Sequence, residues 1–230
     1  MQVFKIPTLR IIMPQKPKKA TKAQISEIKS LFLEHYANAK TELRYNNIYE
    51  LLVCVMLSAQ CTDKRVNLVT PALFAQYPDV KSLANAPLEE IKEYIKSISF
   101  FNNKAINLKK MATQVMQEYN GEIPTTQEAL KTLAGVGQKT ANVVLIEFFE
   151  ANFMAVDTHV FRTSHRLGLS SSSTALQTES DLTKAFKDHL STLHQAFVLF
   201  GRYICKAQKP LCQECFVQHL CKSTQNFKPK

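Results

Sequence analysis

The chain has 230 residues, of which 45% are apolar, and it carries a formal net charge of +10 at pH 7. This length and apolar content exclude a largely disordered chain, because they suffice for one large core or two small ones. The excess of 29 basic over 19 acidic side chains favours a polyanionic partner, either nucleic acid or an anionic membrane. The longest apolar run, Leu51 to Leu57, is too short for a membrane span, so we expect no membrane segment.

The first 20 residues combine five basic side chains with three prolines and contain no apolar stretch followed by a cleavage site. We therefore predict a basic, partly disordered arm over residues 1–20 and no secretory signal. Without such a signal, a reducing cytoplasm is the expected location. Cysteines that cluster in a reducing compartment indicate a metal site rather than disulfides.

Apolar side chains recur at helical spacing through most of the chain. The stretch 48–55 has the i, i+3, i+4, i+7 pattern after Asn46 and Asn47, which are good helix caps. Another stripe follows Pro87, a residue that suits a first helical position. No pair of alternating strands with a hairpin turn stands out. The sequence predicts an all-α protein with roughly ten helices.

Two further patterns mark where helices begin and where one loop lies. Thr21 with Gln24, and Thr125 with Glu128, have the spacing of capping boxes. The serine run at residues 170–173 indicates a loop.

Two of the five glycines, Gly135 and Gly137, flank Val136. A helix from about residue 126 should end before them, and the next should begin at about Gln138. The glycines allow a tight turn and close approach to a ligand, while Val136 can pack back between the helices. The free N–H groups at the start of the second helix can bind an anion such as a DNA phosphate.

The second helix, over residues 138–149, is apolar nearly all round and is therefore expected to be buried. Lys139 lies in its first turn, at the positive end of the helix and beside this buried segment. We expect its pKa to be lowered, as an amine nucleophile requires. The alternative is a helix-turn-helix with a solvated lysine.

Asp157 precedes Thr158 and His159 at the expected start of a later helix, where an aspartate can serve simply as the N-cap. Four of the six cysteines follow with the spacing C-x6-C-x2-C-x5-C. Four thiolates can ligate zinc or an iron–sulfur cluster, and the spacing does not choose between them. These four are Cys205, Cys212, Cys215 and Cys221.

The glycine hairpin, the Asp157 segment and the four cysteines together resemble the endonuclease III family of base-excision DNA glycosylases. The resemblance extends from about Ala23 to Cys221. It implies a helix-hairpin-helix motif and a [4Fe–4S] cluster on the four cysteines. It also implies two helical domains that flank a DNA-binding cleft. One is a six-helix barrel with the hairpin over residues 41–151, and the other is an iron–sulfur cluster domain over 1–40 and 152–230.

The resemblance also implies a reaction on double-stranded DNA. The enzyme would remove oxidised or damaged pyrimidines and then nick the strand at the abasic site. Lys139 would attack the sugar C1′ and form a Schiff base, and β-elimination would cut the strand. Asp157 would stabilise the cationic sugar and help to deprotonate Lys139.

Because a base inside a duplex is out of reach, the damaged nucleotide has to be flipped out. The family resemblance places Gln60 in the vacated stack and Phe100 as a second wedge, where the family more often has an aliphatic residue. The alternatives are a surface residue after a helix for Gln60 and a core aromatic for Phe100. The remaining residues for which the resemblance implies DNA contact are Gly135, Val136, Gly137, Thr140, His159, Lys206 and Lys209.

The chain departs from the family at Ala134, where a proline is common; alanine leaves φ free, so a more mobile turn is expected. The rival functions are a monofunctional glycosylase, a non-catalytic DNA-binding or redox-sensing module, and a zinc protein. Monofunctional relatives generally lack the hairpin lysine and carry a further C-terminal domain, whereas this chain has Lys139 and ends shortly after Cys221. We expect a bifunctional enzyme, monomeric and cytoplasmic, acting at the nucleoid.

Overall fold

The computed structural model describes residues 19–223, and every regular element in that range is helical, which confirms the all-α prediction. Of the predicted basic arm, residues 1–18 lie outside the described range. None of the helices in the described range is long and apolar enough to cross a membrane. The elements are α1 (Lys22–His35), α2 (Ile48–Ser58), α3 (Asp63–Gln76), α4 (Val80–Asn85), α5 (Leu88–Ile95), α6 (Phe101–Glu118), α7 (Gln127–Leu130), α8 (Gln138–Phe149), α9 (Thr158–Arg166), α10 (Ala175–Phe186), α11 (Leu190–Tyr203), and the 3₁₀ turns η1 (Cys212–Glu214) and η2 (Gln218–Leu220).

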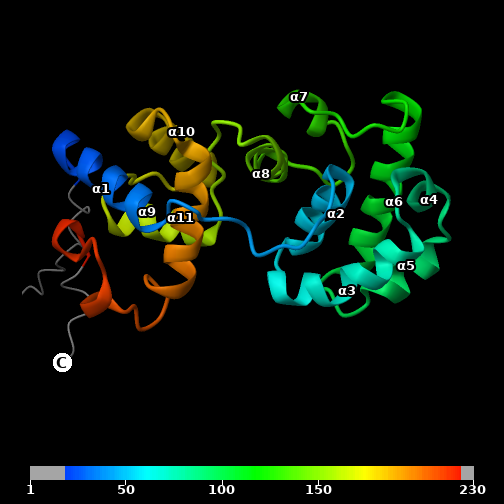
Figure 1. Ribbon diagram of the computed structural model, residues 1–230, viewed down its shortest axis with the longest axis horizontal. Helices are drawn as coiled ribbons and strands as arrows, with labels where there is room; N and C mark the ends of the chain where they lie inside the picture. Colours follow the sequence, from blue (N-terminus) through cyan, green and yellow to red (C-terminus); the bar gives the residue numbers. More distant parts are fainter. Residues whose placement is uncertain (1–18, 224–230) are drawn as a thin grey trace, which may run out of the picture.

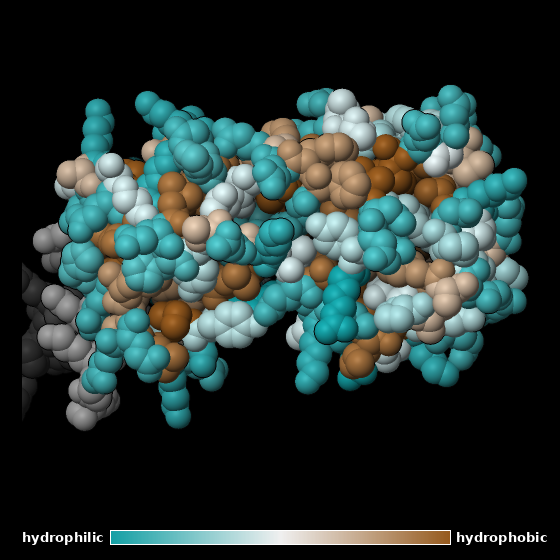
Figure 2. Space-filling model, in the orientation of Figure 1, coloured by the Kyte–Doolittle hydropathy of each residue, from teal (hydrophilic) through white to brown (hydrophobic). Residues whose placement is uncertain are grey.

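The helices form two domains, each with its own hydrophobic core. Helices α2–α6 lie on one side, and α1 with α9–α11 on the other, while α8 lies between them (Figure 1). One core draws its buried residues from 43–155, and the second draws them from α1 and residues 154–220. The space-filling view shows the same two masses joined through a narrower region (Figure 2). The chain therefore passes from one mass to the other twice, before α2 and after α8.

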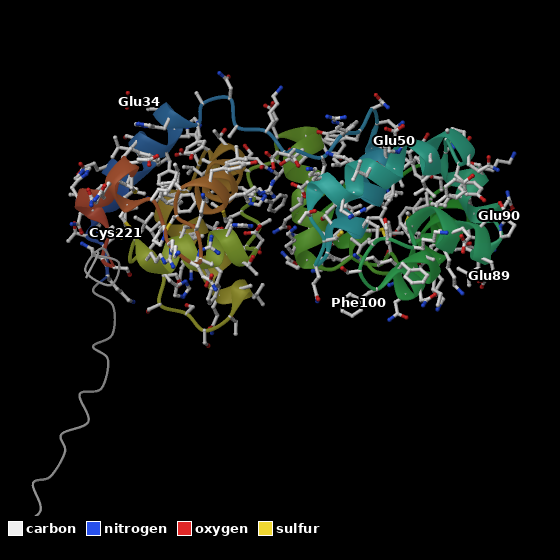
Figure 3. The ribbon with its side chains drawn as sticks, turned by 90° about the horizontal axis from the view of Figure 1, so that it is seen from below. Glu34, Glu50, Glu89, Glu90, Phe100 and Cys221 are labelled. Carbon is white, nitrogen blue, oxygen red and sulfur yellow. The ribbon has the colours of Figure 1, made fainter. Side chains whose placement is uncertain are left out.

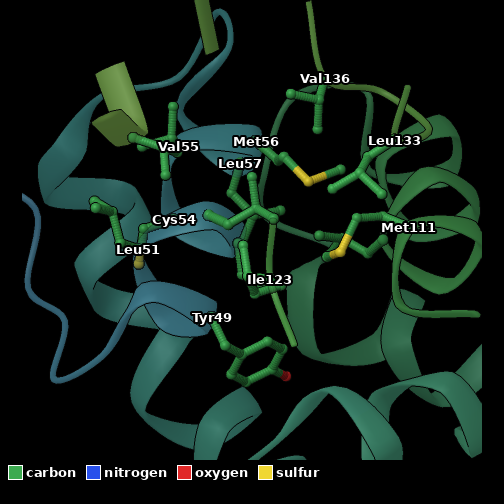
Figure 4. Packing of buried hydrophobic residues seen from close by; sticks show 14 of the residues in the cluster. Tyr49, Leu51, Cys54, Val55, Met56, Leu57, Met111, Ile123, Leu133 and Val136 are labelled. Atoms are coloured by element: carbon green, nitrogen blue, oxygen red, sulfur yellow. The ribbon is translucent and has the colours of Figure 1, made fainter. Parts of the chain in front are cut away.

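Helix α2 is the centre of the first core. Every residue from Tyr49 to Leu57 is buried, and Figure 4 shows several of these side chains packed against residues of other elements. A helix that is apolar nearly all round has to be surrounded by others. The charged residue among them, Glu50, accepts hydrogen bonds from the backbone N–H and the side-chain amide of Asn46, at 2.7 and 2.9 Å.

An aromatic cluster organises the second core. The ring of Phe32 in α1 stacks on Phe197 of α11 at 4.2 Å and meets Phe200 edge-on at 5.0 Å. Phe216 adds a fourth ring, 5.1 Å from Phe32. Because Phe216 follows Cys215 directly, this cluster fixes the cysteine loop to α1 and α11.

The expected helix starts are correct in two places and shifted in two others. Asn47 caps α2, and Thr21 with Gln24 forms the capping box of α1. The box expected at Thr125 is wrong: Thr126 is the cap, and its side chain accepts from Ala129 N. Helix α7 has only four residues, so its sequence contains few positions from which the exact start could be predicted. Pro87 is likewise the N-cap of α5 rather than its first residue.

The expectation that α8 is buried throughout is wrong for its last turn. Residues 141–146 are buried, but Phe148 and Phe149 remain 41% and 46% exposed. Their rings meet edge-on at 5.1 Å. The helix leaves the core here, because its C-cap Glu150 adopts a left-handed conformation and turns the chain away.

Candidate active site and iron–sulfur loop

The hairpin between α7 and α8 is held against α6. Gly135 has φ +78°, and a Cβ at this position would lie 2.9 Å from Cβ of Asn107. Val136 packs into the first core with 6% of its surface exposed, as predicted. The backbone N–H of Ala134 donates to Oε1 of Gln114 at 2.7 Å. Proline has no N–H, so this bond anchors the turn in a way that the more common family residue cannot.

Gly137 is the N-cap of α8, with an extended φ of −95°. No other atom lies within 4 Å of a Cβ built there, and α8 has no side-chain cap. The open side of Gly137 and the first N–H groups of α8 can therefore receive a phosphate at close range.

A cavity of about 380 Å³ lies between the two domains. Its walls come from the turn between α2 and α3, from α8, and from the facing sides of α9 and α11. Both Lys139 and Asp157 line it, so the structure brings these two predicted residues into one site. Thr140 and His159 line the same cavity.

Lys139 reaches solvent within this cavity, yet protein surrounds it closely enough for desolvation to lower its pKa. The carboxylates of Asp157, Asp63 and Glu147 act in the opposite direction and partly restore the pKa. The lowered pKa expected from the sequence has the correct direction. Burial is the main cause, and it increases the fraction of free amine near neutral pH.

Asp157 is held at the start of α9. Its Oδ1 accepts a hydrogen bond from the N–H of Val160 at 2.8 Å, so it is the N-cap of this helix. The side chain is only partly buried and also lines the cavity. The helix start thus orients the carboxylate, and the N-cap role considered from the sequence is confirmed.

His194 in α11 is a cavity residue that the sequence analysis did not single out. Only 2% of it is exposed, and its Nδ1 has no hydrogen-bond partner. The nearby carboxylate of Asp157 and the backbone of Ala155 favour the protonated ring, but burial outweighs them. Burial lowers the pKa of His194 to about 4, so the ring is neutral at pH 7. A pair of polar residues, His194 and Gln195, among the apolar residues of α11 was the available signal.

A charged network at the rim of the cavity was also missed. Arg202 of α11 lies 2.9 Å from Oδ2 of Asp63 at the start of α3, and it also pairs with Glu42. The hydroxyl of Tyr203 donates to the same Glu42. These contacts join the two domains across the cavity. Sequence separation hides them, because each partner alone resembles an ordinary surface charge.

The two predicted wedge residues lie on exposed turns of the first domain. Gln60 follows α2 with φ 54°, and Phe100 precedes α6 with φ 57°. Phe100 is 63% exposed, and its ring stands clear of the ribbon in Figure 3, so a core aromatic is ruled out. Gln60 is an exposed residue after a helix, which fits both of its readings.

The four cysteines line one pocket in the second domain, walled by apolar side chains that include Phe200 and Leu211. Cys221 lies in the opposite domain from Phe100 (Figure 3). Burial raises the pKa of the Cys205 thiol, and it raises that of Cys215 to about 11. Thiolates therefore persist here only with a strong positive charge beside them, as a bound metal provides. Lys206 and Lys209 are exposed on the same loop.

The four thiols lie around one apolar pocket, and four cysteine thiolates are the ligand set that a four-iron cluster takes. Arg166 supports the loop through Cys205 Sγ at 3.3 Å and the carbonyl of Lys206 at 2.7 Å.

Comparison with known proteins identifies the family. Residues 53–188 match the family model of HhH-GPD superfamily base excision DNA repair proteins. The chain belongs to the endonuclease III family. Residues 205–221 match the iron–sulfur binding domain of endonuclease III. The protein is thus a base excision repair DNA glycosylase with a [4Fe–4S] cofactor, and DNA is its partner.

Three relatives illustrate the similarity. Endonuclease III of Synechocystis sp. is 44% identical over 89% of this chain and 94% of its own length. The Bacillus subtilis enzyme is 44% identical over 83% of this chain and 88% of its own. The structure of a trapped endonuclease III–DNA covalent intermediate has a TM-score of 0.86 at 42% identity. The superposition covers 90% of this chain and 98% of the endonuclease III chain in that structure.

Proposed function

We propose that this enzyme is bifunctional: it removes an oxidised or otherwise damaged pyrimidine from duplex DNA and then cleaves the strand through a lysine Schiff base. The observation that carries the proposal is the shared cavity of Lys139 and Asp157, with the pKa of the lysine lowered by burial. A relative with 42% identity has been seen as a covalent intermediate with DNA, which supports a nucleophile on the protein.

In the proposed reaction, the lone pair of Lys139 Nζ attacks C1′ as the glycosidic bond breaks. The departing base takes the electron pair of the glycosidic bond and the proton that Nζ loses once it is bonded to C1′. Asp157 stabilises the positive charge that develops on the sugar, and it accepts a proton from the Lys139 ammonium. Opening of the sugar gives an imine between Nζ and C1′. Loss of a C2′ proton then expels the 3′ phosphate by β-elimination.

The cluster loop and the hairpin would hold the DNA backbone. The hairpin offers the open side of Gly137 and the N–H groups of α8, and the cluster loop offers Lys206 and Lys209 to phosphates. When bound, the cluster supplies a rigid core for this loop. We further propose the domain boundaries 41–151 against 1–40 with 152–230, a monomeric enzyme, and action at the nucleoid in the cytoplasm.

The proposal is tested by borohydride trapping on a duplex with one abasic site. Wild-type protein should form a covalent adduct that Lys139→Gln loses while still binding DNA. Asp157→Asn should form the adduct more slowly. An unchanged adduct yield in Lys139→Gln would overturn the assignment of the nucleophile. A wild-type protein that excises a damaged base but gives no adduct would be a monofunctional glycosylase.

A further inference from the structure

The two wedge residues share an unusual backbone conformation. Gln60 and Phe100 both lie in the left-handed region, at φ 54° and 57°. Residues other than glycine adopt this region sparingly, and they keep it only where the surrounding structure fixes them. Both turns belong to the first domain, yet they are 40 positions apart in the chain. Something in the packing has to hold them.

Lys104, in the first turn of α6, contacts both turns. Its Nζ donates to the carbonyl oxygens of Leu57 at 2.8 Å and Ala59 at 2.6 Å. These two carbonyls belong to the end of α2 and to its C-cap, directly before Gln60. The backbone N–H of Lys104 donates to the carbonyl of Phe100 at 3.1 Å. One residue therefore connects the two wedge turns.

The electrostatics explain why a lysine serves here. A cation in the first turn of a helix is unfavourable for that helix, since the N-terminus already carries partial positive charge. The ammonium of Lys104 is directed instead at the end of α2, where the last carbonyls lack partners within the helix and carry partial negative charge. The ammonium is partly withdrawn from water, and this desolvation lowers its pKa.

We propose that Lys104 is a positioning residue that fixes Gln60 and Phe100 relative to each other, so that both enter the duplex together when a nucleotide is flipped out. The inference rests on the proposed function, because it takes both residues as wedges. Lys104 itself does not line the cavity of Lys139, whereas Ala59 and Gln60 of the turn that it holds do. We therefore expect its loss to slow extrusion more than the chemistry of the exposed sugar.

The same helix offers a matched control. Nζ of Lys109 donates to the carbonyl of Ala86 at 2.7 Å, and Ala86 is the C-cap of α4. Lys109 is partly buried like Lys104 and makes the same kind of bond, but to a turn that carries no wedge. Lys109→Met thus removes an equivalent bond, and Lys104→Arg restores a cation with donors for two carbonyls.

The experiment compares two substrates with the cluster-containing enzyme. A duplex with a damaged pyrimidine requires extrusion, whereas a single strand with an abasic site requires only the lysine chemistry. Lys104→Met should lose about tenfold or more in duplex rate, the scale expected for hydrogen bonds from a charged donor. Its single-strand rate should stay within about twofold of wild type. Lys109→Met should match wild type on both substrates, and Lys104→Arg should recover most of the duplex rate.

Two further variants separate the inference from the function on which it rests. If Gln60→Ala and Phe100→Ala both keep the full duplex rate, the wedge assignment itself fails. If they slow the duplex reaction while Lys104→Met behaves like Lys109→Met, the positioning role is overturned. An equal loss on both substrates in Lys104→Met would also overturn it, because that pattern indicates general damage to the fold. The fluorescence of 2-aminopurine opposite the lesion reports extrusion directly and should fall with Lys104→Met.

Discussion

Replacing each hairpin glycine by alanine should separate folding from DNA binding. At Gly135, φ is +78° and the new methyl would lie 2.9 Å from Cβ of Asn107. The left-handed conformation alone costs alanine about 1–2 kcal/mol, and displacing Asn107 brings the total to about 2–3 kcal/mol. For a chain of this size, that corresponds to a fall in melting temperature of roughly 4–12 °C.

Gly137 provides the contrast, because φ is −95° and no atom lies within 4 Å of the added methyl. Alanine is a poorer N-cap than glycine, so Gly137→Ala should cost at most about 1 kcal/mol. Its methyl, however, occupies the open side where a phosphate would approach. Thermal unfolding of the cluster-containing protein and fluorescence anisotropy on an abasic-site analogue measure the two effects. Equal stability losses in the two variants, or none in Gly135→Ala, would refute the reasoning.

Two buried groups give predictions that depend on pH. In the native protein burial lowers the pKa of His194 to about 4, whereas a histidine in the unfolded chain has a pKa of about 6.5. The free energy of unfolding should therefore fall by up to about 3 kcal/mol as the pH drops from about 6.5 to about 4. Denaturant unfolding of wild type and His194→Gln across this pH range tests the prediction. The free energy of unfolding should depend less steeply on pH in the variant, and an equal pH dependence in both proteins would contradict the prediction. Glu147→Gln removes one carboxylate that raises the pKa of Lys139, so the pH profile of adduct formation should move to lower pH; an unmoved or opposite profile would show that Glu147 does not influence the lysine.

The helices and the hairpin could be predicted because their signals are local. Apolar spacing defines α2, and the two glycines around Val136 define a turn whose packing is as expected. The direction of the Lys139 pKa shift was also accessible, since a lysine beside a buried segment loses hydration. Local signals fail where an element is very short, as at the one-turn α7, or where a helix leaves the core, as at Phe148.

The cavity itself was less accessible to sequence reasoning, because its walls come from both domains. The pairing of Arg202 with Glu42 joins residues 160 positions apart, and no periodic pattern reports such a contact. The family resemblance predicted that Lys139 and Asp157 share one site. Neither residue, considered alone, indicated that the other lies beside it. His194 was overlooked for a related reason: a histidine within an apolar stripe is usually a satisfied core residue, whereas this one has an unpaired Nδ1.

The interleaving of the two cores has a consequence for how the chain is made. Helix α1 leaves the ribosome before the whole first domain, while its partner α11 follows that domain. Until α11 emerges, Phe32 of α1 lacks the rings of Phe197 and Phe200 that pack against it in the native fold. The first domain is complete in sequence well before then and can fold as a unit during synthesis. The cysteine loop comes later still, so the four iron ligands are all present only after the whole first domain has been synthesised.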